Sequence, residues 1–286
     1  MPPRLTAASA PLMREVDVFD EYGATRRISI PAERALTVFV DKRELVTLMT
    51  LGAAPELLVL GYLRNQRLVS AAGDIESITV DWDVHAAAVK TRHGIERFDE
   101  KTAKRIVTTG CGQGTMFGNL MDELDAAKLP SAAVARIHQS TLHQLNDAMR
   151  KTDSVHRRAG SVHGCALFRG TEMLKFVEDV GRHNAIDTIA GWMWLQGDSS
   201  LGQGADKVFY TTGRLTSEMV TKAAQLGVPI VISRNGVTQM GYELAGKLGM
   251  TLFGRASQRH FICYCGFERF DAEPEPERPA VHVVTG

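Results

Sequence analysis

The chain is poor in cysteine and has no excess of either charge. Only four cysteines occur in 286 residues, which is typical of a reducing compartment where thiols stay free. The 33 basic residues balance the 33 acidic ones, so no overall field attracts nucleic acid or an anionic membrane. An anionic ligand must therefore be held by local features of the chain.

Long hydrophobic runs are also missing. No window reaches the roughly 18 consecutive apolar residues of a membrane helix, and residues 1–13 lack the apolar centre of a signal peptide. We therefore expect a cytoplasmic protein with no membrane and no nucleic-acid partner. The hydrophobic fraction of 44% is ordinary for a folded protein, and the length allows one large domain or two modest ones.

Composition and periodicity divide the chain into four regions. Residues 1–30 mix proline, alanine and charges without periodicity and are interpreted as an N-terminal extension. Residues 31–125 are a smaller strand-rich part, and residues 126–271 alternate strands with helices. Residues 272–286 contain a Pro/Glu-rich run that cannot bury a core, which predicts a flexible tail.

The strand-rich region predicts a small mixed sheet with one helix. Residues 36–40 and 45–51 are apolar and flank a polar segment, which is the pattern of a hairpin. Residues 55–63 begin with a proline and carry apolar side chains at helical spacing, so we expect a short helix there. Residues 75–90 alternate between apolar and polar side chains and predict one half-buried strand.

The second region predicts a layered α/β domain. Residues 131–149 carry apolar side chains at helical spacing after Ser131, which is a suitable N-cap. Strands and helices then alternate, which favours a largely parallel sheet. The expected strands are 165–168, 173–177, 208–210, 230–232, 251–253 and 261–264, and the later helices are 183–195, 217–226 and 239–248.

One cysteine lies among three glycines. Cys111 is part of the segment TGCGQGT, residues 109–115, directly after the apolar pair Ile106 and Val107. Glycine tolerates backbone conformations that other residues avoid, so the segment predicts a mobile loop that carries one thiol to solvent or to a partner. A plain glycine-rich turn with an incidental cysteine explains the same stretch. The stretch alone leaves both interpretations open.

Three loops of the second region combine glycine or hydroxyl residues with an arginine where a predicted strand leads into a helix. Ligands of α/β sheets gather at the carboxyl ends of strands, helix N-termini favour anions, and a guanidinium binds phosphate in two places. Capping and turn formation explain each loop on its own, but three together favour a phosphate-rich ligand such as a nucleotide. No Walker A or dinucleotide-binding fingerprint is present. The candidate binding residues are Gly181, Arg182, His183, Asn184, Thr212, Gly213, Arg214, Ser233 and Arg234.

The remaining cysteines do not form a zinc signature. A zinc deaminase needs His-x-Glu and a later Cys-x-x-Cys, whereas here His163 precedes Cys165 and the later pair is Cys263 and Cys265. Alternate residues of a strand face the same side about 6.8 Å apart, which is outside the usual disulfide range and awkward for a metal. We therefore predict structural thiols and no metal site, with His163 as a minor candidate for lining the ligand site.

The loops belong to a longer series of motifs. The segments DVGRHNAID at 179–187, TGRLTSEMVTKAA at 212–224, GVPI at 227–230 and LFGRAS at 252–257 follow one another in the chain. In this order they resemble the motifs of the FdhD family, which comprises accessory sulfurtransferases for formate dehydrogenase. The resemblance spans about residues 30–270. It implies a cytidine-deaminase-like three-layer α/β domain without the deaminase zinc site, with a smaller strand-rich N-terminal domain.

The resemblance also implies a function. Members of the family take sulfur from a cysteine desulfurase as a persulfide on a loop cysteine, which corresponds here to Cys111. They pass it to the metal of a molybdenum bis-molybdopterin guanine dinucleotide, which they bind as a substrate and which formate dehydrogenase then receives. Guanine nucleotide binding in the three loops and a homodimer are further implications. The family's cofactor-binding stretch near the C-terminus corresponds to Leu252, Phe253, Gly254, Arg255, Ala256 and Ser257.

The loop departs from the family pattern at one position. The usual Cys-x-x-Cys runs here from Cys111 to Gly114, so the second loop thiol is absent. One thiolate can still attack a donor persulfide and hold the transferred sulfur. It is open at this point whether Cys165 takes the place of the missing thiol. The departure also motivates a second hypothesis, a non-catalytic chaperone that binds and inserts the cofactor for a molybdoenzyme.

Overall fold

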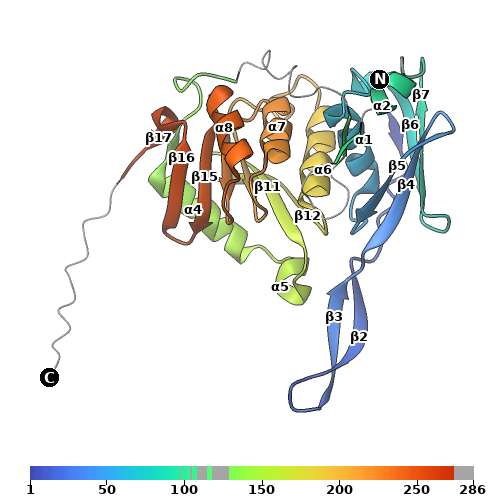
Figure 1. Cartoon of the computed structure of the whole chain (residues 1–286), viewed down its shortest axis with the longest axis horizontal. Helices are drawn as coiled ribbons and strands as arrows, with labels where there is room; N and C mark the ends of the chain where they lie inside the picture. Colours follow the sequence, from blue (N-terminus) through green and yellow to red (C-terminus); the bar gives the residue numbers. More distant parts are fainter. Residues whose placement is uncertain (97, 104, 108–114, 118–128, 274–286) are drawn as a thin grey trace.

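The two largest sheets of the described structure are joined by a pair of helices (Figure 1). A five-stranded sheet carries helix α1 (Pro55–Asn65), and a six-stranded sheet carries helix α6 (Arg182–Leu195). The two parts meet where α1 packs against α6. Among the described helices, none is long and apolar enough to span a bilayer. The computed structural model describes residues 1–96, 98–103, 105–107, 115–117 and 129–273.

The smaller sheet is built from two hairpins and one short N-terminal strand, in the order β1-β6-β7-β4-β5. The predicted hairpin is confirmed as β4 and β5, whose turn residues Asp41 and Lys42 have positive φ angles of 46° and 70°. Such a turn matches the twist of antiparallel strands. The predicted short helix is confirmed as α1. The strand bounds are Arg4–Leu5 (β1), Arg34–Val40 (β4), Arg43–Thr50 (β5), Ile75–Asp81 (β6) and Ala86–Thr91 (β7).

The prediction of one strand over residues 75–90 is wrong. The segment forms β6 and β7, which pair antiparallel around a reversal at residues 82–85. The backbone N–H of Asp83 donates to the carboxylate of Asp81, and His85 has a φ of 53°, so the chain turns there. The sequence pattern does not reveal this turn, because Trp82 and Val84 continue the apolar residue at every second position into the turn.

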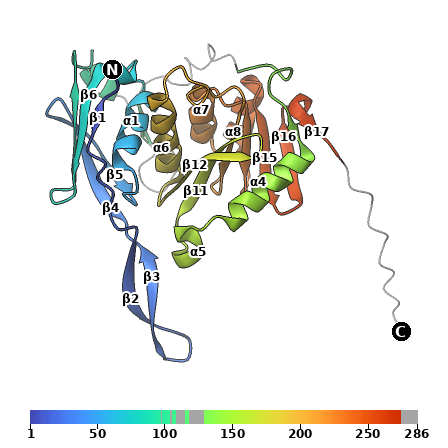
Figure 2. The same ribbon diagram turned by 180° about the vertical axis from the view of Figure 1, so that it is seen from behind.

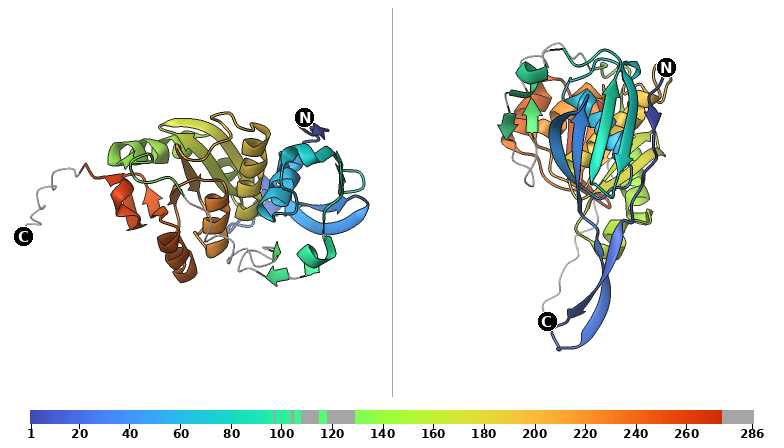
Figure 3. Two further views of the ribbon diagram at one scale, coloured as in Figure 1. Left: turned by 90° about the horizontal axis from the view of Figure 1, so that it is seen from above. Right: turned by 90° about the vertical axis from the view of Figure 1, so that its right-hand side faces the viewer.

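The first 31 residues contain more regular structure than their sequence indicates. Strand β1 pairs parallel with β6 at the edge of the smaller sheet. Strands β2 (Met13–Phe19) and β3 (Thr25–Pro31) pair antiparallel in a hairpin. Figures 1 and 3 show this hairpin extending away from the body of the molecule.

The glycine-rich segment follows the smaller sheet. Helix α2 (Phe98–Ala103) leads to β8 (Arg105–Val107), which pairs antiparallel with β9 (Thr115–Phe117). Cys111 comes between these two strands in the sequence and lies outside the described residues. Its role as the persulfide cysteine therefore stays a prediction.

The larger part has three layers, as expected. Its sheet, in the order β12-β11-β13-β14-β15-β16, has α6, α7 and α8 on one face and α4 (Gln139–Lys151) on the other (Figure 2). Neighbouring strand residues alternate between two apolar cores, so that Leu252 faces one and Phe253 the other. The bounds are His163–Arg169 (β11), Glu172–Asp179 (β12), Lys207–Thr211 (β13), Ile230–Ser233 (β14), Thr251–Ser257 (β15), His260–Cys265 (β16), Ser217–Gln225 (α7) and Gln239–Lys247 (α8).

The prediction of a largely parallel sheet is wrong. In the described sheet, parallel pairing is confined to β13 with β14 and β14 with β15. The other pairings, β11 with β12, β11 with β13 and β15 with β16, are antiparallel. Gly170 and Thr171 alone link β11 to β12, and Gln258 and Arg259 alone link β15 to β16. Links of two residues can join only antiparallel strands, because a parallel neighbour needs a long crossover.

The helix predicted over residues 131–149 begins later in the structure. Helix α4 spans Gln139–Lys151, and its N-cap is His138 rather than Ser131. The preceding residues Ile137–His138 form strand β10, which pairs parallel with β17 (Phe270–Asp271) near the end of the described chain. A short helix, α5 (Val155–Ala159), follows α4.

Two glycines allow α1 and α6 to pack backbone against backbone. A Cβ atom on Gly61 would collide with the carbonyl oxygen of Asp187, and one on Gly191 would collide with the carbonyl oxygen of Leu57. Close packing, not an unusual backbone conformation, therefore requires glycine at both positions. Since α1 belongs to the smaller sheet and α6 to the larger one, this crossing joins the two parts.

Gly61→Ala is expected to lower the free energy of unfolding by about 1–3 kcal/mol or more, because the added methyl group forces α1 away from α6. Gly246→Ala is the matched control, since Gly246 also lies in a helix, α8, but a Cβ there meets open space. The control is expected to raise stability by up to about 1 kcal/mol through helix propensity. Urea unfolding measures both variants, and equal effects of the two substitutions would contradict the close packing.

Candidate functional site

A cavity of about 410 Å³ lies between α4 and the larger sheet, at the ends of β13 and β15. The carboxyl ends of the parallel strands β13, β14 and β15 meet here, which is the usual place for ligands in α/β sheets. Helices α4 and α5 close the cavity from the other side. Its lining includes Asn146, Arg150, Arg157, Phe176, Tyr210, Thr212, Arg234, Ala256 and Ser257.

The cavity combines positive charge with aromatic surface. Arg150, Arg157 and Arg234 line it together with Phe176 and Tyr210. Guanidinium groups bind phosphate in a bidentate manner, and aromatic rings offer a flat surface on which a base can stack. Burial raises the pKa of Tyr210, so its phenol stays neutral. These groups suit a ligand that carries both phosphate and a flat ring system.

One carboxylate lines the same cavity, and each of its two oxygens accepts a hydrogen bond from the protein backbone. Glu178 accepts the backbone N–H of Val155 at 2.6 Å and that of His156 at 3.0 Å. The Ser154 side chain accepts the N–H of Arg157 at 3.2 Å. Both acceptors satisfy free N–H groups at the start of α5. The carboxylate is therefore part of the wall, and the arginines supply the charge available to a ligand.

Four of the predicted binding residues line this cavity. Thr212 follows β13, Arg234 follows β14, and Ala256 and Ser257 end β15. Thr212 is held by two bonds to Gly164: its N–H donates to the carbonyl oxygen at 2.9 Å, and its hydroxyl accepts the N–H at 3.0 Å. The structure thus brings together loops that are separate in the sequence.

Reasoning from the sequence missed the helical side of the cavity. Arg150 at the end of α4 and Arg157 in α5 line it, and so does Asn146 one turn earlier in α4. The concentration of basic residues between positions 150 and 158 is a signal that could have pointed to the two arginines. Asn146 leaves no such signal, because a single asparagine in a helix is common.

The predicted residues at the start of α6 lie outside the cavity lining. The side-chain amide of Asn184 donates to Asp179 at 2.9 Å and to the backbone oxygen of Met49 at 2.6 Å. The N–H of Gly181 and the hydroxyl of Thr50 also donate to Asp179, at 3.0 Å and 2.5 Å. Burial raises the pKa of Asp179, although these donors oppose the shift. These hydrogen bonds connect the start of α6 to β5 of the smaller sheet.

Two other predicted residues, Arg182 and Gly213, contact each other. Arg182 is 3% exposed, and a Cβ on Gly213 would collide with its side chain. The hydroxyl of Ser233, also a predicted residue, donates to the carbonyl oxygen of Gly213 at 2.6 Å. Arg214 is exposed and does not belong to the cavity lining. Glycine at position 213 therefore makes room for a buried arginine.

The C-terminal binding stretch is divided between core and cavity. Leu252 and Phe253 are fully buried, each in a different core. Gly254 leaves room for a tyrosine ring, and Arg255 is exposed. Only the last two residues of the predicted stretch line the cavity. Ligand binding by this stretch stays a prediction. Within the stretch, Ala256 and Ser257 are the residues in a position to contact a ligand in the cavity.

Three cysteines lie in the described residues, and burial makes each of them a poor nucleophile. Burial raises the pKa of Cys165 to about 12, and its thiol donates to the hydroxyl of Thr211 at 3.2 Å. Burial also raises the pKa of Cys263 to about 11 and that of Cys265 above its ordinary value. Because sulfur exchange needs a thiolate, the burial of Cys165 disfavours it as a replacement for the missing loop thiol.

A bulge separates Cys263 from Cys265. The pairing register of β15 and β16 shifts between Leu252 and Phe253. Cys263 therefore packs against the core on the α4 side, and Cys265 packs against the core under α6, α7 and α8. The expectation that both thiols face the same side is wrong, while their packing agrees with structural thiols. Within the part of the chain that the structure describes, no group of three or more His, Cys, Asp and Glu side chains could hold a metal ion.

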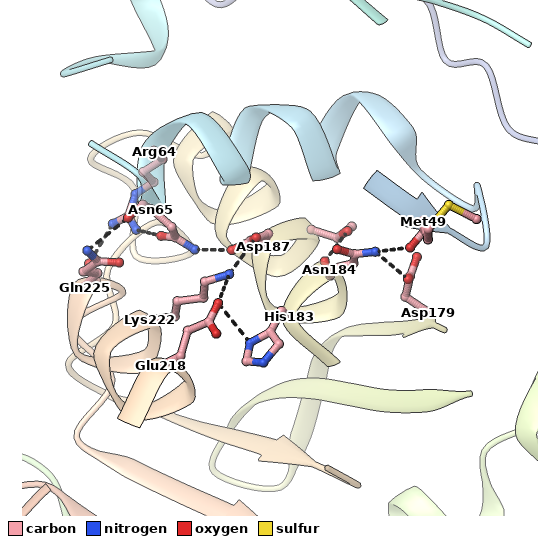
Figure 4. A network of polar contacts seen from close by, with 11 residues as sticks. Met49, Arg64, Asn65, Asp179, His183, Asn184, Asp187, Glu218, Lys222 and Gln225 are labelled. Atoms are coloured by element: carbon pink, nitrogen blue, oxygen red, sulfur yellow. Dashed lines mark hydrogen bonds and ion pairs between the residues drawn. The ribbon is translucent and has the colours of Figure 1, made fainter. Parts of the chain in front are cut away.

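A chain of buried polar groups runs from α1 through α6 to α7 (Figure 4). Asp187 accepts hydrogen bonds from the Asn65 amide at 2.7 Å and from the Lys222 ammonium at 2.8 Å. The Oε1 atom of Glu218 lies 3.3 Å from the Nζ atom of Lys222 and 3.3 Å from the Nδ1 atom of His183. Burial acts to lower the pKa of Lys222, but Asp187 and Glu218 together raise it. Lys222 is therefore a charged group held between two carboxylates.

His183 is neutral in the folded protein at neutral pH. Burial lowers its pKa to about 3, and the Glu218 carboxylate opposes this only in part. In the unfolded chain the ring binds a proton below about pH 6.5. Between these two values the unfolded state binds more protons, so the free energy of unfolding falls as the pH falls.

His183→Gln is expected to remove this contribution, which amounts to at most about 1.4 kcal/mol per pH unit below about pH 6.5. Urea unfolding at several pH values between about 7 and 5 measures the slope in the parent and the variant. His93→Gln, at an exposed position, is the matched control and is expected to keep the parent's slope. The burial of His183 would be contradicted by a slope that does not change in His183→Gln.

These features define an α/β protein of two joined sheets whose larger sheet carries a basic, partly aromatic cavity at its strand ends. The chain belongs to the FdhD/NarQ family, whose model matches residues 31–271. The family indicated by the sequence motifs is thereby confirmed.

Curated relatives and a solved structure agree with this membership. The sulfur carrier protein FdhD of Bacillus subtilis is 31% identical over 238 residues, which cover 83% of this chain and 88% of that protein. The protein of the same name from Listeria innocua is 28% identical over 242 residues, 84% of this chain and 91% of that protein. A structure described as a formate dehydrogenase accessory protein of Desulfotalea psychrophila has a TM-score of 0.70, 24% identity and coverage of 91% of this chain and 100% of its own. The last comparison shows a shared fold.

Proposed function

We propose that the protein is a sulfur carrier for formate dehydrogenase maturation. Cys111 accepts sulfur as a persulfide from a cysteine desulfurase and passes it to the metal of a bound molybdenum bis-molybdopterin guanine dinucleotide, which is the substrate. The observation that carries this proposal is family membership over residues 31–271, together with curated relatives named sulfur carrier proteins. The basic cavity and the chemistry of the cysteines support it.

The cysteines support Cys111 as the carrier because the other three are unsuited to exchange. Cys165 is fully buried with a pKa of about 12, and burial also raises the pKa of Cys263 and Cys265. One thiolate is sufficient, because each exchange step uses a single attacking sulfur.

Two balanced steps describe the transfer. The Cys111 thiolate attacks the outer sulfur of the desulfurase persulfide, forms a new S–S bond and releases the desulfurase cysteine as a thiolate. In the second step the persulfide loses its proton to solvent and its S–S bond breaks. A reduced metal centre of the substrate supplies two electrons, so that the outer sulfur becomes a metal-bound sulfide and Cys111 leaves as a thiolate.

The cavity supports the proposal that the protein binds the guanine dinucleotide substrate. Its volume of about 410 Å³ falls in the range of small-molecule sites. Arg150, Arg157 and Arg234 suit the diphosphate of one guanine nucleotide arm, and Phe176 and Tyr210 offer surface for a ring. We propose that one such arm of the substrate binds here.

Several further properties that family membership implies for this protein are also part of the proposal. They are a cytoplasmic location, association with a cysteine desulfurase and with formate dehydrogenase, and a homodimer. The cytidine-deaminase-like relationship of the larger part belongs here as well, and its three layers of helix, sheet and helix support it.

Incubation with a cysteine desulfurase and cysteine is expected to add the mass of one sulfur atom to the parent protein and none to Cys111→Ala. Intact mass spectrometry before and after reduction measures the adduct. Cys263→Ala is the matched control, because it also lacks one thiol but keeps Cys111, and it is expected to gain sulfur like the parent. A persulfide on Cys111→Ala would contradict the assignment of the carrier.

Complementation of cells that lack the protein distinguishes a sulfur carrier from the non-catalytic chaperone that the absence of a second loop thiol at Gly114 suggests. The parent protein is expected to restore formate dehydrogenase activity, and Cys111→Ala is expected not to restore it. Restoration by Cys111→Ala would favour a non-catalytic chaperone that binds and inserts the cofactor.

Arg234→Ala is expected to weaken GDP binding by about tenfold or more, because a charge-assisted bond contributes about 1.5–3 kcal/mol. Arg214→Ala is the matched comparison, since Arg214 also follows a strand end and is exposed but lies outside the cavity lining. Isothermal titration with GDP measures both variants, and little change is expected for Arg214→Ala. A larger loss in Arg214→Ala than in Arg234→Ala would place the phosphate elsewhere.

A further inference from the structure

The hairpin of β2 and β3 extends from the body of the molecule and exposes apolar side chains (Figures 1 and 3). Leu12 and Met13 at its base pack against an apolar cluster that includes Val155 of α5. Phe19 and Tyr22 near its tip are 79% and 86% exposed. The match to the family model begins at residue 31, after most of the hairpin. The proposed sulfur transfer therefore gives these exposed side chains no role.

One face of the hairpin is an apolar stripe. Val16 of β2 lies opposite Ile28 of β3. Val18 and Ile30, two positions further along their strands, point to the same face. Ile28 is 40% exposed and Ile30 is 38% exposed, so the stripe is open to solvent.

Both strands of the hairpin have a free edge. Among the described strands, β2 and β3 pair only with each other. A two-stranded hairpin alone is at best marginally stable in water, and a free edge readily accepts another strand. A further strand beside the hairpin would satisfy its backbone and cover the apolar stripe.

The charges of β2 disfavour pairing of its edge with a second copy of the chain. A two-fold axis perpendicular to the sheet makes two identical edge strands antiparallel. When two β2 strands pair about their central residue, Val16, Glu15 of one copy lies opposite Asp17 of the other. Like charges directly opposite each other destabilise a sheet.

The β3 edge has no such conflict. When two β3 strands pair about their central residue, Ile28, Arg26 lies opposite Ile30 and Arg27 lies opposite Ser29. Both arginines also form an ion pair with an aspartate of their own hairpin, at 3.3 Å and 2.9 Å. Two β3 strands can therefore approach without uncompensated positive charge between them.

We propose that two copies of the chain pair through the edges of β3, antiparallel and centred on Ile28. The result is one sheet in the order β2-β3-β3-β2, in which the apolar stripes of the two hairpins join. This inference rests on the homodimer of the proposed function and identifies its interface. Backbone hydrogen bonds between the two β3 strands and burial of the apolar stripes hold the copies together.

Charge complementarity favours a second copy as the occupant of this edge. In the proposed register Thr25 lies opposite Pro31, so the turn at residues 20–24 extends past the base of the other hairpin. At that base β3 contacts α5. The turn carries the exposed Glu21, and α5 carries the exposed Arg158. An acidic turn thus meets a basic helix twice in the symmetric dimer.

A disulfide crosslink tests the register directly. Ile28 lies on the two-fold axis, and directly opposite strand residues have Cα atoms about 4.5–5.5 Å apart, which a disulfide can span. Ile28→Cys, in a Cys111→Ala chain that lacks the loop thiol, is expected to form a covalent dimer on oxidation with copper phenanthroline. Val18→Cys on the outer strand β2 is the matched control and is expected to stay uncrosslinked. Non-reducing gel electrophoresis measures both.

Sedimentation velocity at several concentrations tests the strength of the interface in the full chain. Ile28→Lys is expected to raise the dissociation constant of the dimer by about tenfold or more, because two ammonium groups meet and apolar burial is lost. Val84→Lys is the matched control, since Val84 is also exposed but lies in the turn between β6 and β7. It is expected to dimerise like the parent.

Charge reversal tests the contact between the turn and α5. Glu21→Arg and Arg158→Glu are each expected to weaken the dimer by up to about fivefold, and the two changes together are expected to restore it. Single reversals that leave the dimer unchanged overturn the placement of the turn beside α5.

The remaining outcomes separate this inference from the proposed sulfur carrier. A parent that stays monomeric overturns the interface and leaves the hairpin to a different protein, and a dimer unaffected by Ile28→Lys overturns it as well. Crosslinking through Val18→Cys in place of Ile28→Cys has the same meaning. Circular dichroism checks folding, and the crosslink decides the question if Ile28→Lys does not fold. Intact mass of the parent after sulfur loading is measured separately: a monomer that gains sulfur refutes only the interface, and a dimer that gains none refutes only the carrier.

Discussion

The buried aspartate Asp187 is the constraint on which the arrangement of the two sheets depends. Its backbone oxygen lies against Gly61 of α1, and its carboxylate is bonded to Asn65 of α1 and to Lys222 of α7. Removing one partner of a buried ion pair costs about 3–5 kcal/mol, because an uncompensated charge stays inside the protein. Helices α1, α6 and α7 therefore have one favourable arrangement, which sets the position of one sheet against the other.

This constraint explains why the strongest family motif lies away from the cavity. Asn184 and Asp179 bond to each other and to residues of β5, so the start of α6 is part of the joint between the two sheets. The loops after β13 and β14 supply Thr212 and Arg234 to the cavity. A rigid joint keeps α6, and the strands beneath it, in one place. Residues far from a ligand can thus support its site through packing alone.

The order of elements could be predicted well because helices and strands leave periodic apolar patterns. The predicted ranges of α6, α7 and α8 differ from the structure by one residue. The errors come from contacts that have no local period. Strand β10 pairs with β17, far along the chain, and takes the place of the expected start of α4. The expected strand over residues 75–90 reverses at a turn in which His85 has a positive φ.

The sequence by itself determined the alternation of strands and helices, the family motifs and the placement of Cys111 among glycines, since all of these depend on local residue order. Only the tertiary structure decided which strand-end loops share one cavity and that Asn146 of α4 lines it. It also decided that Cys263 and Cys265 face opposite cores. Strand order and a shift of pairing register depend on contacts between residues that are distant in the chain, and no local pattern encodes their energies.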